Sequence, residues 1–174
     1  MVETETKLFS WCQLLLKRQR QGFGILGEHL QLSPKMYGKL LHADENELQV
    51  TLKDPEQEKF KAQLLSLQKQ RREDEFSELY EWLVRFQVHE PWDMAMIIAS
   101  ASLGFHHLWQ DLGLPERPML TQLMNDCFPE LGARNHPAMR WKKFFYRQLC
   151  LEHGALVCRS PTCDQCSSYS ECFE

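Results

Sequence analysis

The 174-residue sequence lacks the features that mark several broad classes of protein. No apolar run approaches the roughly 20 residues that a membrane-spanning helix requires. The first six residues are acidic and have neither the basic segment nor the apolar segment of a secretory signal. The formal net charge is −4, which gives the chain no bulk attraction for nucleic acid. We therefore expect a cytoplasmic protein whose partners include neither nucleic acid nor a membrane.

The sequence also lacks the local patterns of conventional catalysis. It has no recognisable Ser–His–Asp arrangement, no glycine-rich loop suited to cradling a phosphate, and no dinucleotide-binding fingerprint. We therefore expect that the protein is not an enzyme.

Helical periodicity dominates what is present, and it predicts an all-α fold of about six or seven helices. The residues from Leu48 to Leu52 alternate as a strand would, and the polar stretch from Gln68 to Glu75 suggests a break inside a long helical region. A short turn is expected from His106 to Asp111. We expect helices over residues 5–19, from Ser33-Pro34 through Leu41, from Asp54-Pro55 to about residue 86, over 92–102, from Arg117-Pro118 until Pro129 closes the helix, and over Pro137–Glu152.

The last twenty residues have a different character from the rest of the chain. Four of the seven cysteines lie there, and few residues are of the type that builds a core. Such a segment cannot order itself by apolar burial, whereas metal ligation converts directly into folding free energy. We expect a helical domain over residues 1–154 and a cysteine-rich metal-binding tail over residues 155–174, within one structural unit.

Cys158, Cys163, Cys166 and Cys172 are the predicted metal ligands, with the spacing Cys-x4-Cys-x2-Cys-x5-Cys. Thiols in a reducing compartment usually serve metal binding or redox chemistry rather than disulfides. The first three positions have the spacing of plant-type ferredoxin sites, which bind an iron–sulfur cluster. A zinc site more often combines two close cysteine pairs across a longer spacer. The spacing favours a cluster, with a structural zinc site as the alternative.

A basic and aromatic helix precedes the tail. Trp141, Phe145 and Leu149 recur at helical spacing as a core stripe, with Phe144 beside them. Basic residues occupy the other faces and could offset the charge of a thiolate cluster or attract an oxyanion, although a solvated basic face is the simpler interpretation. These residues are Arg140, Lys142, Lys143 and Arg147. His107 could be a metal ligand or an ordinary hydrogen-bonded histidine.

Three segments together resemble the NifQ family of nitrogen-fixation proteins. They are His107-Leu-Trp-Gln-Asp-Leu-Gly-Leu114, the helix from Met139 to Cys150, and the terminal cysteine motif with the Phe173 that follows it. The resemblance is specific over residues 97–173, including Phe128-Pro129 and Asn135, and weaker over residues 30–96. The family often ends Cys-Phe-Gly, whereas this chain ends in Glu174, beyond the last expected ligand.

The resemblance implies a role in supplying molybdenum during synthesis of the iron–molybdenum cofactor of nitrogenase. It implies a cofactor that is a molybdenum–iron–sulfur cluster held by the four tail cysteines. The implied partners are molybdate, the NifE–NifN assembly scaffold and the nitrogenase iron protein. Under this resemblance, Arg140, Lys143 and Arg147 are expected to form a surface for incoming molybdate or for an acidic partner. His107 is expected to be an additional ligand for molybdenum.

Two other classes of protein are alternatives. Helical DNA glycosylases can carry a similar C-terminal cluster loop, but the first cysteine gap differs here and the net charge does not suit a duplex binder. A zinc-stabilised interaction module is the second alternative, and it would be colourless where an iron–sulfur protein is brown.

Overall fold

The computed structural model describes residues 2–42, 54–89, 91–136 and 138–153, with only the backbone described for residues 2–6. Within these ranges the chain forms helices and no strand, which confirms the all-α prediction. The predicted alternation from Leu48 to Leu52 and the cysteine tail lie outside the described residues. The helices are α1 (Val2–Arg20), α2 (Pro34–His42), α3 (Pro55–Arg71), α4 (Glu73–Val84), α5 (Met94–Ser102), α6 (Leu108–Asp111), α7 (Arg117–Cys127), α8 (Pro129–Arg134) and α9 (Trp141–Glu152).

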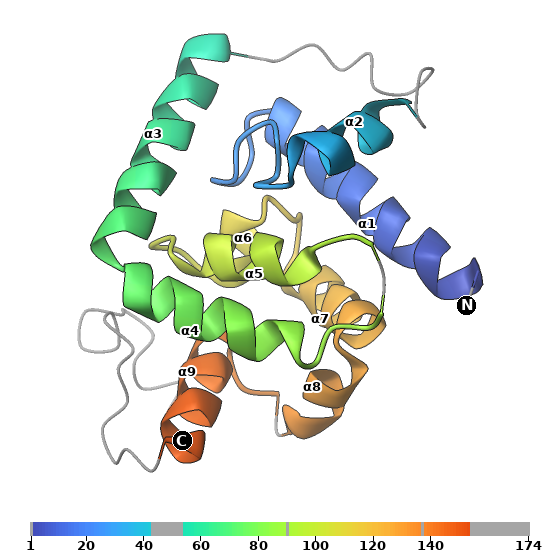
Figure 1. Ribbon diagram of the computed structural model, residues 1–174, viewed down its shortest axis with the longest axis vertical. Helices are drawn as coiled ribbons and strands as arrows, with labels where there is room; N and C mark the ends of the chain where they lie inside the picture. The colour runs from blue at the N-terminus through green and yellow to red at the C-terminus, as the bar shows by residue number, and fades with distance from the viewer. Residues whose placement is uncertain (1, 43–53, 90, 137, 154–174) are drawn as a thin grey trace.

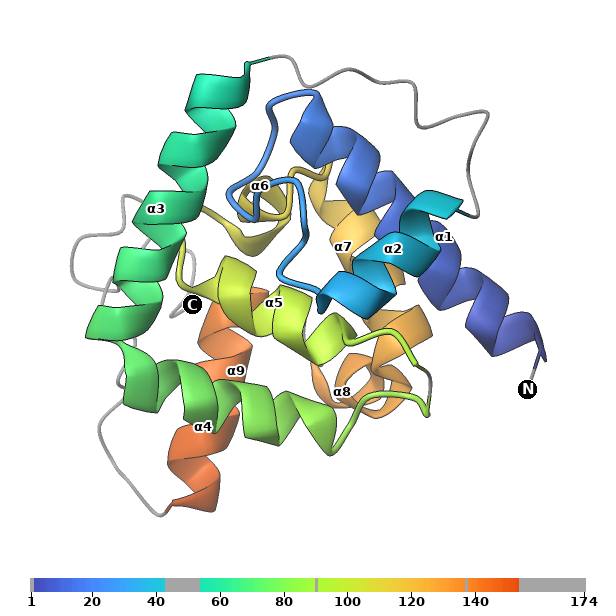
Figure 2. The ribbon, with the colours of Figure 1, turned by 45° about the horizontal axis from the view of Figure 1, so that its top comes forward.

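Helix α5 is the centre of the fold. Eight of its nine residues are buried, as the nearly continuous apolar run predicts. Asp93 caps this helix by accepting from the Met96 N–H at 2.9 Å, and its other carboxylate oxygen accepts from the Tyr80 hydroxyl of α4 at 2.9 Å. In Figures 1 and 2, α4 runs beside α5 while α1, α6 and α7 lie on its other sides. None of the described helices combines the length and the apolar character needed to cross a bilayer.

The break predicted between Gln68 and Glu75 is confirmed, and it consists of the single residue Arg72. This residue separates α3 from α4 with φ −125° and ψ 37°, outside the helical region. Its guanidinium donates to Leu103 O at 3.0 Å, to Glu75 Oε2 at 2.7 Å and to the Tyr146 hydroxyl at 3.3 Å. Arg72 therefore ties the α3–α4 corner to the end of α5 and to α9.

The described residues form nine helices rather than the six or seven expected, because the corner at Arg72 divides one helix and two short helices were not predicted. Helix α6 has four residues, where only a turn was expected. Pro129 follows the end of α7, but it also begins α8 as the first helical residue, where proline's missing N–H costs nothing.

The predicted start of the last helix at Pro137 is wrong, since α9 begins at Trp141. Ala138 has φ +51°, which a right-handed helix cannot include. The side chain of Asn135 donates to Met139 O at 2.9 Å, and Arg117 donates to Ala138 O at 2.9 Å. These side-chain contacts bind the carbonyls of the non-helical approach to α9.

Candidate functional site

The predicted ligands Cys158, Cys163, Cys166 and Cys172 lie outside the described residues. Helix α9 ends at Glu152, and the first of the four cysteines follows six residues later in the sequence. The described residues nearest to these cysteines in the sequence are therefore those at the end of α9.

The aromatic face of α9 anchors this helix in the core, as predicted. Phe145 is fully buried and its ring centroid lies 6.1 Å from that of Trp82 on α4. Trp141 packs edge-on against Phe144 at 5.6 Å. Because such rings contribute large apolar areas, the helix that precedes the tail is held at a fixed position on the domain.

Lys142 does not belong to a solvated basic face. Its ammonium donates to Asp111 Oδ2 at 2.6 Å and to Gly104 O at 2.7 Å. The Asp111 carboxylate is only 1% exposed. Burial raises the pKa of Asp111, and Lys142 partly offsets this rise; burial likewise lowers the pKa of Lys142.

Gly104 is required by this ion pair. A Cβ at position 104 would lie 2.3 Å from the carboxyl carbon of Asp111, closer than atoms can approach. Gly104 follows Leu103, the C-cap residue of α5. Its small size admits a buried carboxylate, which in turn fixes α6 against α9.

His107 and Arg140 come together at the edge of this ion pair. His107 is the N-cap residue of α6, and its backbone N–H donates to Gln110 Oε1 at 3.1 Å. Partial burial lowers the pKa of His107, and the positive charges of Arg140, Lys142 and Arg117 lower it further. The structure thus places His107 in a positive environment made by two residues of the α9 region and one of α7.

The other two predicted contact residues lie farther along α9. Lys143 is half-buried and Arg147 is exposed. Because Lys143, Arg147 and Cys150 follow one another at spacings of four and three residues, they lie along one face of the helix. We call this face, together with Arg140 immediately before the helix, the α9 basic stripe.

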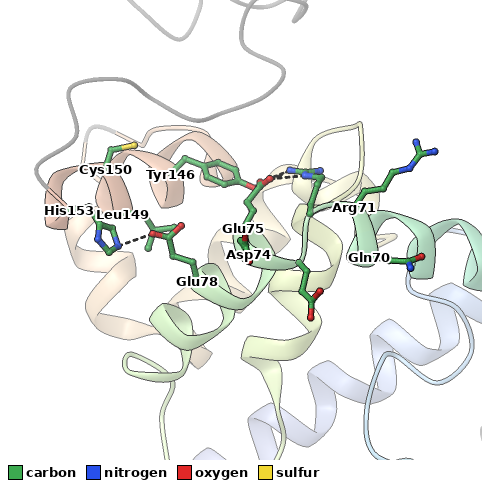
Figure 3. A pocket seen from close by; sticks show the side chains of 11 residues that line it. Gln70, Arg71, Asp74, Glu75, Glu78, Tyr146, Leu149, Cys150 and His153 are labelled. Carbon is green, nitrogen blue, oxygen red and sulfur yellow. Dashed lines mark hydrogen bonds and ion pairs between the residues drawn. The ribbon is translucent and has the colours of Figure 1, made fainter.

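A pocket of about 680 Å³ lies at the end of the α9 basic stripe, between the α3–α4 corner and the last turns of α9 (Figure 3). His153 Nε2 pairs with Glu78 Oε1 at 2.8 Å at its edge. On another wall the Tyr146 hydroxyl donates to Glu75, and burial raises the pKa of Tyr146. The pocket is lined by Gln70, Arg71, Arg72, Glu73, Asp74, Glu75, Glu78, Tyr146, Leu149, Cys150 and His153.

The pocket contains thiol, imidazole and carboxylate groups, all of which can ligate metals. Even so, no three such groups among the described residues lie close enough together to hold a metal ion. Sequence reasoning missed the pocket because its wall combines a polar helix break with residues about 75 positions later. The signal present in the sequence is the polar run from Gln68 to Glu75, which was interpreted only as a break.

Cys12 and Cys127 are core residues. Both are fully buried, and burial raises the pKa of Cys12 to about 12. Burial also raises the pKa of Cys127, and Cys12 and Asp126 add to the rise. Such thiols stay protonated at neutral pH in the metal-free protein.

Comparisons with known proteins agree on one family. A profile of the NifQ family matches residues 11–174. The chain is 54% identical over 104 residues to Protein NifQ of Klebsiella pneumoniae, a stretch that covers 59% of this chain and 62% of that protein. It is 39% identical over 172 residues to Protein NifQ of Azotobacter vinelandii, covering 94% of this chain and 86% of that protein.

A third relative, Protein NifQ of Rhodobacter capsulatus, is 48% identical over 80 residues, or 46% of this chain and 44% of that protein. The matched stretch therefore spans less than two thirds of the Klebsiella and Rhodobacter proteins. No solved structure matches the chain significantly. Because the profile covers almost the whole sequence and the Azotobacter protein is similar along 94% of it, this chain belongs to the NifQ family of nitrogen-fixation proteins.

Proposed function

We propose that the protein binds a molybdenum–iron–sulfur cluster and donates its molybdenum to synthesis of the iron–molybdenum cofactor of nitrogenase. The observation that carries this proposal is the Cys-x4-Cys-x2-Cys-x5-Cys motif, in a chain whose family belongs to nitrogen fixation. Cys158, Cys163, Cys166 and Cys172 are the proposed ligands. The cluster is cargo here, because its molybdenum is meant to leave the protein.

The donor set suits this cargo. Thiolates are soft ligands that bind iron–sulfur clusters, and the first three cysteines have a spacing known from cluster sites. A ligand set made of one short segment can release a metal by local rearrangement, without unfolding the helical core. A metal donor requires both ligands that bind its cargo strongly and a binding site that can open locally.

The α9 basic stripe is the proposed approach route for molybdate. Molybdate is a doubly charged oxyanion, to which positively charged side chains are attracted. Lys143 and Arg147 lie on one face of α9, and Arg140 immediately precedes the helix. Because the aromatic side of α9 is buried in the core, the stripe is held at a fixed position. The proposal therefore assigns these three residues to attraction and orientation of the anion, and not to covalent chemistry.

His107 is the proposed non-cysteine ligand for molybdenum. Its pKa is lowered by burial and by the neighbouring cations, so the imidazole is mainly neutral at pH 7, the form that can ligate a metal. The Asp111–Lys142 ion pair holds α6, which His107 caps, against α9. The proposed recipients are the NifE–NifN scaffold and the nitrogenase iron protein.

The role of the α9 basic stripe is tested by replacing its charged side chains with neutral ones. The triple variant Arg140→Gln, Lys143→Gln and Arg147→Gln should contain normal iron but several-fold less molybdenum after anaerobic purification from molybdate-supplemented cells. The triple variant Lys17→Gln, Lys35→Gln and Lys39→Gln changes charge equally on exposed positions of α1 and α2, and it should match the wild type. Equal molybdenum in both triple variants would refute the role of the stripe.

His107 has a matched control in its neighbour. His107→Ala should lower molybdenum content and donation to cofactor synthesis in vitro, whereas His106→Ala, also at an exposed histidine, should not. If His107→Ala leaves both quantities unchanged, His107 is not a ligand.

A further inference from the structure

Helix α3 exposes an apolar face that the described part of the molecule does not cover. Phe60 is 64% exposed, Leu64 40% and Leu67 52%. The three residues are spaced by four and three positions, so they form one stripe along the helix. In Figures 1 and 2, α3 runs along the edge of the molecule, where a second protein could reach it.

The opposite face of α3 is fixed to the domain, which determines where the stripe points. Glu58 and Leu65 are buried on that face. Lys61 donates to Gly22 O at 2.9 Å, and Lys69 donates to Gln31 Oε1 at 2.9 Å. Because these contacts hold α3 along its length, Phe60, Leu64 and Leu67 cannot turn inward without breaking them.

The exposed face of α3 that contains this stripe is complementary to itself when two copies of the helix run antiparallel. The residues of this face, all exposed, are Glu56, Phe60, Gln63, Leu64, Leu67 and Arg71. Around a centre between Gln63 and Leu64, Phe60 mirrors Leu67, and Glu56 mirrors Arg71. Each apolar end thus has an apolar counterpart, and the negative end has a positive counterpart.

We propose that α3 pairs antiparallel with α3 of a second copy of this chain. In this arrangement Phe60 packs on Leu67 of the second copy, Leu64 packs near the two-fold axis, and Glu56 pairs with Arg71 of the second copy. Every contact occurs twice, as an isologous dimer interface requires. The antiparallel helix dipoles favour the same arrangement.

The length of the exposed face of α3 determines how tightly the two copies should associate. From Glu56 to Arg71 the helix rises about 22 Å, at about 1.5 Å per residue. A single helix pair of this length buries less than the roughly 1,600 Å² of a standard stable interface. The dimer is therefore weak and reversible, and it depends on protein concentration.

Sedimentation equilibrium of the purified full-length protein over a wide concentration range tests the proposal. The wild type should pass reversibly from monomer to dimer as the concentration rises. Leu64→Glu should stay monomeric while keeping the same circular dichroism spectrum. Val84→Glu changes an equally accessible apolar residue, 47% exposed, on α4 and should dimerise like the wild type. A wild type that stays monomeric throughout, or a Leu64→Glu variant that still dimerises, overturns the proposal.

Charge reversal tests the antiparallel register. Glu56→Arg alone and Arg71→Glu alone each place like charges at both ends of the homodimer, and each should raise the dimer Kd by about tenfold. An equimolar mixture of these two single variants restores both opposite-charge pairs in a heterodimer. The mixture should therefore associate more tightly than either variant alone. A mixture that associates no better than the separate variants overturns the register.

Discussion

The ammonium of Lys142 on α9 lies 2.6 Å from the carboxylate of Asp111, which ends α6 and is 1% exposed. The ion pair joins two segments 31 residues apart in the sequence, and the backbone carbonyl of Gly104 completes the contacts of the ammonium. His107 is the N-cap residue of α6 and Arg140 is the N-cap residue of α9, the two helices that the ion pair joins. The ion pair therefore fixes the position of the part of the described surface that we propose contacts the metal.

Breaking the ion pair should destabilise the fold. Lys142→Met leaves the Asp111 carboxylate buried and unpaired, and such losses cost about 3 kcal/mol. Lys143→Met, the adjacent half-buried lysine, is the control and should cost much less. Urea unfolding followed by circular dichroism measures both free energies. Adding Asp111→Asn to Lys142→Met should recover part of the loss, and equal losses in the two single variants would contradict a buried ion pair at this position.

The same variant should acquire a defined pH dependence. Burial already raises the pKa of Asp111, and loss of Lys142 raises it further. A folded-state pKa above the unfolded value stabilises the fold at acidic pH, and this contribution disappears as the pH rises through the folded pKa. The deficit of Lys142→Met should therefore be smallest near pH 4 and grow towards neutral pH, as urea unfolding at several pH values would measure. A deficit that shrinks as the pH rises would contradict the assignment.

The positive environment of His107 can be measured directly. We expect the pKa of His107 to lie below the ordinary value of about 6.5, because burial and the charges of Arg140, Lys142 and Arg117 all disfavour the imidazolium. NMR titration of metal-free protein should show the pKa rising in Arg140→Gln and unchanged in Arg147→Gln. A His107 pKa that responds equally to the two substitutions would show that Arg140 has no special position.

The three cysteines outside the tail should differ in reactivity. In a variant with serine at the four tail positions, iodoacetamide should modify Cys150 in the folded protein and leave Cys12 and Cys127 unmodified. Cys150 is partly exposed, whereas burial excludes the reagent from the other two and keeps their pKa high. Mass spectrometry should find one modified thiol under native conditions and three in urea. Native modification of Cys12 would contradict the core described here.

The helices that the sequence predicts best are those with a strong local signal. The continuous apolar run of α5 predicts a buried helix, and the interruption after Gln68 predicts the corner at Arg72. The start of α9 was mispredicted, because the contacts of Asn135 and Arg117 with the backbone override helix propensity at Ala138. Local patterns do not show that Arg117, 21 residues earlier in the sequence, contacts the carbonyl of Ala138.

The candidate site likewise has features that the sequence predicts and features that only the fold creates. The cysteine motif and the basic character of α9 are visible in the sequence, because spacing and charge are local properties. The burial of Lys142 is not visible, since its neighbours Arg140 and Lys143 have the same charge and only the fold brings Asp111 and Gly104 to one of the three. The pocket beside Cys150 likewise depends on the packing of the α3–α4 corner against α9.

The helical core should not depend on the metal. Replacing Cys158, Cys163, Cys166 and Cys172 together with serine removes no residue of the described core, so the circular dichroism spectrum and the thermal midpoint should stay close to those of the wild type. Iron and molybdenum should both be lost. A variant that unfolds would show instead that metal binding stabilises the whole domain.

The proposal that the four tail cysteines hold a cluster from which molybdenum is donated is tested by the metal content of the protein. The quantities to measure are iron, molybdenum, zinc and acid-labile sulfide in anaerobically purified protein, together with its EPR spectrum. We expect a brown protein that contains iron, sulfide and molybdenum with the EPR signal of a paramagnetic cluster, all absent from the four-serine variant. Stoichiometric zinc without iron, in colourless protein purified in the same way, would contradict the proposal.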